Sequence, residues 1–135
     1  MARALPSVPD MVIQAIFPWC LTPELYATKP EYIDSLAAFV RGRPVPPLDA
    51  FLQESEAVLS HDVEAQLQAI HTPTLITYGR YDMVTSTRFV PMLTSHIKGA
   101  EVVIFEGCAH TPIYEKVQEF NQTTLEFLQR HAGQA

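Results

Sequence analysis

Residues 73–82 read Pro-Thr-Leu-Ile-Thr-Tyr-Gly-Arg-Tyr-Asp, and this stretch decides the fold together with a similar one later in the chain. The β-branched and aromatic run Thr74–Tyr78 predicts a short strand that leads directly into a glycine. Glu101–Phe105, Glu-Val-Val-Ile-Phe, predicts a second strand of the same kind. Residues 86–97 lie between them with apolar residues at helical spacing, and Pro91 delays or kinks the first turn. This order predicts two adjacent parallel strands joined by a helical crossover.

A further helical pattern follows the second strand. Thr111 is expected to cap this helix, with Pro112 at its first position, where a missing N–H does no harm. An apolar stripe then continues as one helix to near the C-terminus. The stripe contains Ile113, Val117, Phe120, Thr124, Phe127 and Leu128. The predicted fold class is therefore α/β, with helices flanking the strands.

The chain before residue 71 has a different pattern, which predicts short helices separated by proline and no convincing strand. Asp10 is expected to cap the first helix, and Pro18 and Pro23 to break the chain after it. Later helices are expected to begin at Pro30, at Leu48 and after Asp62. These patterns divide the chain into a helical segment, residues 1–70, and a β-α-β-α segment, residues 71–135.

The composition indicates a globular protein with no affinity for nucleic acid or membrane. The 135 residues are 47% hydrophobic and 18% charged, which suits a single buried core. The net charge is −6 without any cluster of Lys or Arg, which argues against nucleic acid as a partner. No apolar run could span a membrane and no signal-peptide pattern follows Met1, so a cytoplasmic location is expected. Cys20 and Cys108 fit neither a disulfide framework nor a metal-ligand spacing.

Two polar residues follow the ends of the two predicted strands. Asp82 lies in the loop after the first strand, and His110 lies in the loop after the second. The carboxyl ends of adjacent parallel strands meet at one edge of a sheet, so these side chains are expected to lie together. A carboxylate beside an imidazole fixes its tautomer and lets it act as a general base. Asp82 and His110 are therefore the candidate catalytic residues. The alternatives are that Asp82 is a simple turn residue and His110 only a residue near a helix start.

The same stretches resemble the C-terminal part of α/β-hydrolases. Pro73–Asp82 is similar to the penultimate strand and acid loop of that family. Gly107–His110, followed by Glu115, is similar to the last strand, the catalytic-histidine loop and the closing helix. The order of acid before histidine also matches. The helices before residue 70 resemble, more loosely, the cap of esterase, enol-lactonase and proline iminopeptidase-like members.

This resemblance implies a partial α/β-hydrolase fold, in which a helical cap segment precedes two parallel strands. It also implies a full-length parent enzyme that uses no cofactor or metal. That parent would hydrolyse an ester, a lactone or a related carbon-centred bond in a small molecule. Asp82 would orient His110, which would deprotonate a serine and later protonate the leaving group.

The family's nucleophile motif is missing from the chain. None of its serines has the flanking glycines of Gly-x-Ser-x-Gly, and the oxyanion-hole loop and the earlier strands are missing too. The serines are Ser7, Ser35, Ser55, Ser60, Ser86 and Ser95. The chain is therefore expected to be the C-terminal part of a longer enzyme, truncated or separately encoded, and inactive alone. The alternative is a non-catalytic helical binding or regulatory module that acts by association.

Two parallel strands are too few to form a stable sheet by themselves. The edge of the first strand would be open, and an open apolar edge is a template for another chain. The chain is therefore expected to form a homo-oligomer or to pair with a separate N-terminal half that carries the nucleophile.

Cys108 is an alternative nucleophile because it lies close to His110 in sequence, but a reactive thiolate needs a positioned base and oxyanion donors, which are not evident. His61 with Asp62, or these two together with Asp82 and His110, could be taken for metal ligands. Neighbouring residues rarely converge on one ion, however, and a helix cap explains Asp62 more simply. Glu115 is expected to interact with the dipole of the closing helix. The remaining candidates are Arg80 and Glu106, expected to be solvated loop charges, and Phe17, Trp19 and Tyr26, expected in the core of the helical segment.

Overall fold

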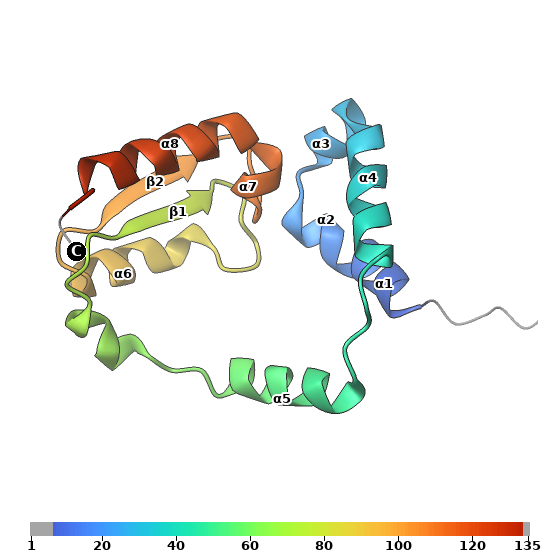
Figure 1. Cartoon of the computed structure of the whole chain (residues 1–135), viewed down its shortest axis with the longest axis horizontal. Helices are drawn as coiled ribbons and strands as arrows, with labels where there is room; N and C mark the ends of the chain where they lie inside the picture. Colours follow the sequence, from blue (N-terminus) through green and yellow to red (C-terminus); the bar gives the residue numbers. More distant parts are fainter. Residues whose placement is uncertain (1–6, 134–135) are drawn as a thin grey trace, which may run out of the picture.

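The computed structural model of the chain describes residues 7–133 and places a two-stranded sheet beside a group of helices (Figure 1). Strand β1, Leu75–Gly79, and strand β2, Glu101–Phe105, pair in parallel along their whole length. Leu75 lies opposite Glu101, and Gly79 lies opposite Phe105. The prediction of two adjacent parallel strands is therefore confirmed.

Helices cover the two faces of the sheet. A short 3₁₀ turn, η3 (Thr87–Phe89), leads into helix α6 (Val90–His96), which lies on one side of the strands in Figure 1. Pro91 lies in the first turn of α6, and the helix begins late, as predicted. Helix α8, Val117–Arg130, lies on the other side.

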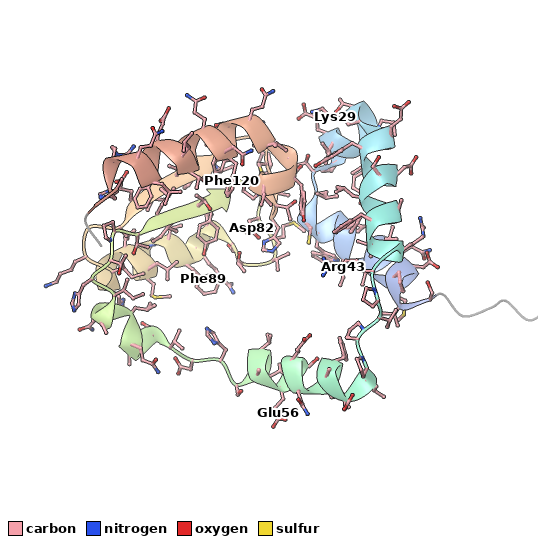
Figure 2. All side chains as sticks on the ribbon, viewed as in Figure 1. Lys29, Arg43, Glu56, Asp82, Phe89 and Phe120 are labelled. Carbon is pink, nitrogen blue, oxygen red and sulfur yellow. The ribbon has the colours of Figure 1, made fainter. Side chains whose placement is uncertain are left out.

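The core under α8 is aromatic. Phe105 at the end of β2 is fully buried, and its ring centroid lies 6.0 Å from that of Phe120 on α8. Figure 2 shows Phe120 between α8 and the strands. This contact holds the end of β2, and with it the following loop, against the closing helix.

The closing helical pattern is interrupted, so the prediction of one continuous helix from Pro112 is wrong. Helix α7, Pro112–Glu115, ends at Lys116, whose backbone leaves the helical region before α8 begins. Thr111 does not cap α7 with its side chain. Its hydroxyl donates to the carbonyl of Cys20 at 3.1 Å, so the side chain is oriented towards the end of α2.

The first N-terminal helices form one continuous helical path that includes a π-helical turn. Helix α1 (Val8–Met11), a π-helical turn η1 (Val12–Ile16) and helix α2 (Phe17–Cys20) follow one another without a loop. The prediction that Pro18 breaks this path is wrong, because Pro18 lies in the first turn of α2, where its missing N–H is tolerated. The predicted cap is also wrong: Ser7, not Asp10, caps α1, and its hydroxyl accepts from the backbone N–H of Asp10 at 3.3 Å.

Helices α3 (Pro23–Thr28) and α4 (Pro30–Arg41) form a small core with the end of α2. α4 begins at Pro30 and ends at Gly42, as predicted. The core consists of Leu21, Leu25 and Ile33, with Phe17 packed against them. The expectation that Trp19 and Tyr26 lie in this core is wrong, because they are 54% and 37% exposed.

Helix α5, Leu48–Leu59, follows the predicted linker and stands apart from the other helices in Figure 1. It contains no buried residue. The expected fourth helix is only a 3₁₀ segment, η2 (Glu64–Ala69), although Asp62 does accept from the Glu64 N–H at 3.4 Å. The division of the chain near residue 70 stays a prediction. Within residues 7–133, no helix has the length and apolar character needed to cross a membrane.

Candidate acid–base site

The loops that follow β1 and β2 lie in direct backbone contact. The N–H of Arg80 donates to the carbonyl of Phe105, and the N–H of Tyr81 donates to that of Cys108, both at 2.9 Å. Gly79 lies so close that a Cβ there would be 1.7 Å from the carbonyl oxygen of Ala109. The contact requires glycine at this position, and it sets the two loops side by side.

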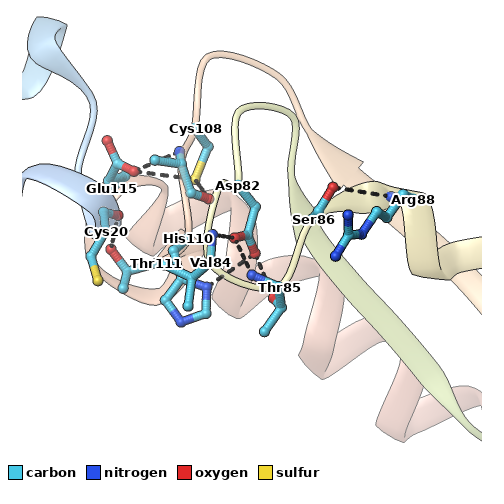
Figure 3. Close-up of polar contacts among 11 residues, drawn as sticks. Cys20, Asp82, Val84, Thr85, Ser86, Arg88, Cys108, His110, Thr111 and Glu115 are labelled. Carbon is cyan, nitrogen blue, oxygen red and sulfur yellow. Dashed lines mark hydrogen bonds and ion pairs between the residues drawn. The ribbon is translucent and has the colours of Figure 1, made fainter. Parts of the chain in front are cut away.

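Asp82 is buried and accepts four hydrogen bonds (Figure 3). Its Oδ1 accepts from the N–H groups of Val84 and Thr85 at 2.8 and 2.9 Å. Its Oδ2 accepts from the Thr85 hydroxyl at 2.8 Å and from His110 Nδ1 at 3.0 Å. Burial by itself raises the pKa of this carboxyl, but the bonds from His110, Thr85 and Val84 outweigh burial and lower the pKa of Asp82 to about 2.

The histidine is held at one ring nitrogen and open at the other. An ionised Asp82 accepts the Nδ1 proton of His110, which leaves the Nε2 lone pair of the neutral ring available for a proton. The His110 side chain is 30% exposed, and Nε2 has no hydrogen-bond partner among the residues described. The structure therefore brings the two predicted residues together in an arrangement suited to a general base. Their catalytic role stays a prediction.

A second carboxylate fixes the loop that carries the histidine. Glu115 Oε1 accepts from the N–H of Ala109 at 2.7 Å, and Glu115 Oε2 accepts from the N–H and the hydroxyl of Thr22 at 2.9 and 2.6 Å. Glu115 does lie in the first turn of α7, as predicted, but its hydrogen bonds reach beyond that local role. Its partners belong to distant parts of the chain, which a local sequence pattern does not reveal.

Cys108 belongs to the core and not to the reacting groups. Its side chain is fully buried, with Sγ 3.6 Å from Glu115 Oε1. Burial, followed by the nearby Glu115 carboxylate, raises the pKa of the Cys108 thiol to about 12. A thiol that is both inaccessible and protonated is a poor nucleophile. The structure contradicts the alternative in which Cys108 is the nucleophile.

No serine takes the place of the nucleophile within residues 7–133, since none of their hydroxyls hydrogen-bonds to His110. Ser86 is near Asp82 in sequence, but its hydroxyl accepts from the Arg88 N–H. Its backbone has the unusual φ of 52°, a strained conformation in the loop that carries the acid.

The other candidate polar residues take no part in this arrangement. Arg80 and Glu106 form an exposed ion pair, with Nε 2.9 Å from Oε1. His61 and Asp62 are exposed. In the described part of the chain, no three His, Cys, Asp or Glu side chains converge as metal ligands would.

Sequence reasoning missed two supports of the site. Thr85 bonds to Asp82 through both its backbone N–H and its hydroxyl, and its spacing from the acid is a turn signal that could have been recognised. Thr22 binds Glu115, which lies 93 positions later in the sequence, and no local sequence pattern indicates this contact.

An apolar pocket of about 270 Å³ lies beside the strand-end loops. The turn between α2 and α3 forms one wall, and the loops after β1 and β2 form the other. Its lining includes Trp19, Leu21, Thr22, Tyr81, Met83 and Ala109. Figure 2 shows the neighbouring Asp82 between the strand ends and α2.

The chain is similar in sequence to curated hydrolases and in fold to solved ones. It is 39% identical over 67 residues to a proline iminopeptidase of Saccharolobus solfataricus, a match that covers 50% of this chain and 21% of that protein. It is 39% identical over 90 residues to a 2-hydroxy-6-oxononadienedioate/2-hydroxy-6-oxononatrienedioate hydrolase of Klebsiella pneumoniae, covering 62% of this chain and 30% of that protein. Its fold matches the enol-lactonase of Burkholderia xenovorans LB400 with a TM-score of 0.76 at 19% identity, over 87% of this chain and 44% of that one.

No protein-family model matches the chain. The chain spans less than half the length of each of these three proteins.

Proposed function

Because the chain belongs to the α/β-hydrolase superfamily, we propose that it supplies the acid and the base of a Ser-His-Asp hydrolase. The observation that carries this proposal is the 3.0 Å hydrogen bond from His110 Nδ1 to Asp82 Oδ2 at the carboxyl ends of two parallel strands. In this arrangement Asp82 orients the imidazole and stabilises its protonated form, while Nε2 remains free to act.

The reaction would proceed in two halves. His110 Nε2 takes the proton of a serine hydroxyl, and the serine oxygen attacks the carbonyl carbon of an ester or lactone. The imidazolium then gives its proton to the leaving alkoxide oxygen as the carbon–oxygen bond breaks. Water, deprotonated by the same nitrogen, hydrolyses the acyl-serine and returns the serine hydroxyl. The chain alone would be inactive, because its described residues provide neither that serine nor an oxyanion hole.

The substrate would be a small molecule with an apolar part. The 270 Å³ pocket is lined mainly by apolar and aromatic side chains and adjoins the loops that hold the acid and the base. The N-terminal helices, which form its other wall, would serve as the cap over the site.

The nucleophile would come from a segment that pairs with β1. The Glu101 N–H donates to the carbonyl of Thr74, and the Arg80 N–H donates to the carbonyl of Phe105. Successive residues of a strand point their N–H and C=O groups to opposite sides, so those of Leu75 and Thr77 point away from β2. Within residues 7–133 no strand pairs along that edge. A parallel strand from a nucleophile-bearing N-terminal half would complete it, and self-association is the alternative.

The second candidate function is a non-catalytic module that binds by association. The exposed apolar residues of α5 favour it, because none of the residues of this helix is buried within the chain. A group of exposed apolar side chains of this kind is typical of a surface that a partner covers. Those residues are Leu48, Phe51, Leu52, Val58 and Leu59. The two candidates differ in their need for His110.

The first test is to read the DNA sequence immediately upstream of the segment that encodes this chain. An in-frame Gly-x-Ser-x-Gly segment is expected within about two hundred residues, as the strand order of the fold requires. The joined protein is then assayed with p-nitrophenyl esters. His110→Ala is expected to lower kcat by about 10⁶ and Asp82→Asn by about 10⁴, while the exposed control His61→Ala leaves it unchanged. Equal activity in His110→Ala would favour the binding module instead.

A further inference from the structure

Glu115 joins two parts of the molecule with its two carboxylate oxygens. Oε1 accepts from the Ala109 N–H at 2.7 Å and from the Cys108 thiol at 3.6 Å, both in the histidine loop. Oε2 accepts from the N–H and the hydroxyl of Thr22 at 2.9 and 2.6 Å. Thr22 ends the segment Cys20–Thr22, which runs from the last residue of α2 to the cap of α3 and which we call the corner.

A second hydrogen bond links the corner to the other side of the histidine. The Thr111 hydroxyl donates to the carbonyl of Cys20 at 3.1 Å (Figure 3). The residues directly before and after His110 are thus both attached to the corner, one through Glu115 and one directly. The peptide that carries the imidazole therefore has little freedom to move without the corner.

The partners of Glu115 are well enough buried for these bonds to matter. Thr22 is 7% exposed and Ala109 is 5% exposed, so water does not readily replace a lost bond at either end. Hydrogen bonds to a charged group in such surroundings are stronger than neutral ones on the surface. The link is therefore a rigid one.

The corner also faces the apolar pocket. Leu21 and Thr22 line the pocket from one side, and Ala109 lines it from the other. A molecule that fills the pocket would therefore touch both residues that Glu115 connects. Binding in the pocket and the placement of the histidine loop therefore depend on the same two residues, Thr22 and Ala109.

We propose that Glu115 is a positioning residue, which couples the corner and the pocket to the orientation of His110. The proposal rests on the proposed function, because the position of the imidazole matters only if His110 acts as a base. A shift of α2 and α3 on ligand binding would reach His110 through Glu115 and Thr111. Asp82 would still fix the tautomer, and Glu115 would fix the place from which the ring acts.

The chain itself, labelled with ¹⁵N, allows the test without any catalytic activity. Two signals are followed by nuclear magnetic resonance: the hydrogen exchange of the Ala109 amide and the ring nitrogens of His110. Glu115→Gln places an amide NH₂ against the donors of either Thr22 or Ala109, so one side of the link must open. Glu126→Gln removes a carboxylate from the exposed face of α8 and is the matched control.

In Glu115→Gln the remaining carbonyl oxygen is expected to stay with the two donors of Thr22, which places the NH₂ against Ala109. The Ala109 amide is then expected to exchange at least about tenfold faster, the change that a loss of roughly 1.4 kcal/mol produces. The His110 ring signals are expected to shift or broaden as the loop gains alternative positions. Thr22→Val, which keeps the backbone donor and loses the hydroxyl, should give the same changes at smaller size. Glu126→Gln should give neither.

The proposal is overturned if folded Glu115→Gln keeps both signals unchanged. Where Glu115→Gln does not fold, Thr22→Val decides: unchanged His110 signals in that variant also overturn it. The proposed function fails by a different result. If the ring of the unmodified chain carries no Nδ1 proton, or if Asp82→Asn leaves its tautomer unaltered, then the acid–base pair is absent whatever Glu115 does.

Discussion

His110 Nδ1 lies 3.0 Å from the Oδ2 atom of Asp82, and Thr85 donates two further hydrogen bonds to the same carboxylate. The acid is thus surrounded by donors in a buried place, and the imidazole has one fixed nitrogen and one open nitrogen. This relationship makes the stability of the fold depend on the charge of one carboxyl group.

The stability of the chain should fall in acid in a way that Asp82 explains. The pKa of Asp82 is lowered from its ordinary 3.8 to about 2, so its ionised form stabilises the fold above about pH 4, and this stabilisation is lost as the pH falls through 2. The loss should amount to roughly 2 kcal/mol. Urea denaturation from pH 6 to pH 2 measures the free energy of unfolding of the unmodified chain and of Asp82→Asn. The difference between the two should become smaller as the pH falls from 4 to 2. A difference of constant size would contradict the assignment. Glu126→Gln, which removes an exposed carboxyl on α8, is the control.

Gly79→Ala should destabilise the chain by at least about 3 kcal/mol, because the new methyl group overlaps the backbone of Ala109, which cannot turn aside as a side chain can. Gly99→Ala is the control: it has a φ of +77° but no atom within 4 Å of the new methyl group. That variant should lose only about 1 kcal/mol to backbone strain. Thermal or urea unfolding compares the two, and equal losses would show that the close approach is unimportant.

The two cysteines should differ in reactivity. Cys108 is fully buried with its pKa raised to about 12, so a thiol reagent at pH 8 should label it only after unfolding. Cys20 is only partly buried and should react first, although burial raises its pKa as well. Mass spectrometry of peptides after timed labelling measures the order. Rapid labelling of Cys108 in the folded chain would reopen the thiol mechanism.

The isolated chain should hydrolyse p-nitrophenyl acetate no faster than its His110→Ala variant. Without a serine or oxyanion donors, the imidazole gives water only weak general-base help. Stopped-flow absorbance detects both the steady rate and any burst. A burst that disappears specifically in Cys108→Ala would overturn this expectation.

The exposed face of α5 should take part in association. Leu52 is 57% exposed, and covering such a side chain in an interface contributes about 1.5–3 kcal/mol. Leu52→Lys should therefore weaken self-association, or binding of a nucleophile-bearing half, by about tenfold or more. Gln53→Lys adds the same charge on the neighbouring face and should have little effect. Sedimentation equilibrium at micromolar concentration measures both, and a compact monomer in every case would contradict the prediction.

Much of the fold was predictable because its signals are local. Glu101–Phe105 is the second strand as predicted, and Thr74–Tyr78 differs from the observed first strand by one residue at each end. Asp82 and His110 were predicted to meet because topology alone brings the ends of parallel strands together. No knowledge of their contacts was needed.

The errors occurred where a distant or additional partner outweighs a local preference. The Thr111 side chain donates to Cys20 and does not cap α7, and Lys116 interrupts the last helical pattern. Trp19 is apolar and was expected in the core, yet more than half of it is exposed beside the pocket. Burial depends on which surfaces meet, and hydrophobic character alone does not decide it.

The sequence by itself determined the order of strand, helix and polar loop, because periodicity and turn residues act over a few neighbouring positions. Only the tertiary structure decided that Glu115 binds Thr22 across 93 positions and that Gly79 lies against Ala109. It also decided that the apolar face of α5 stays uncovered. Such contacts depend on how whole elements pack, and packing leaves no trace in the local pattern of either partner.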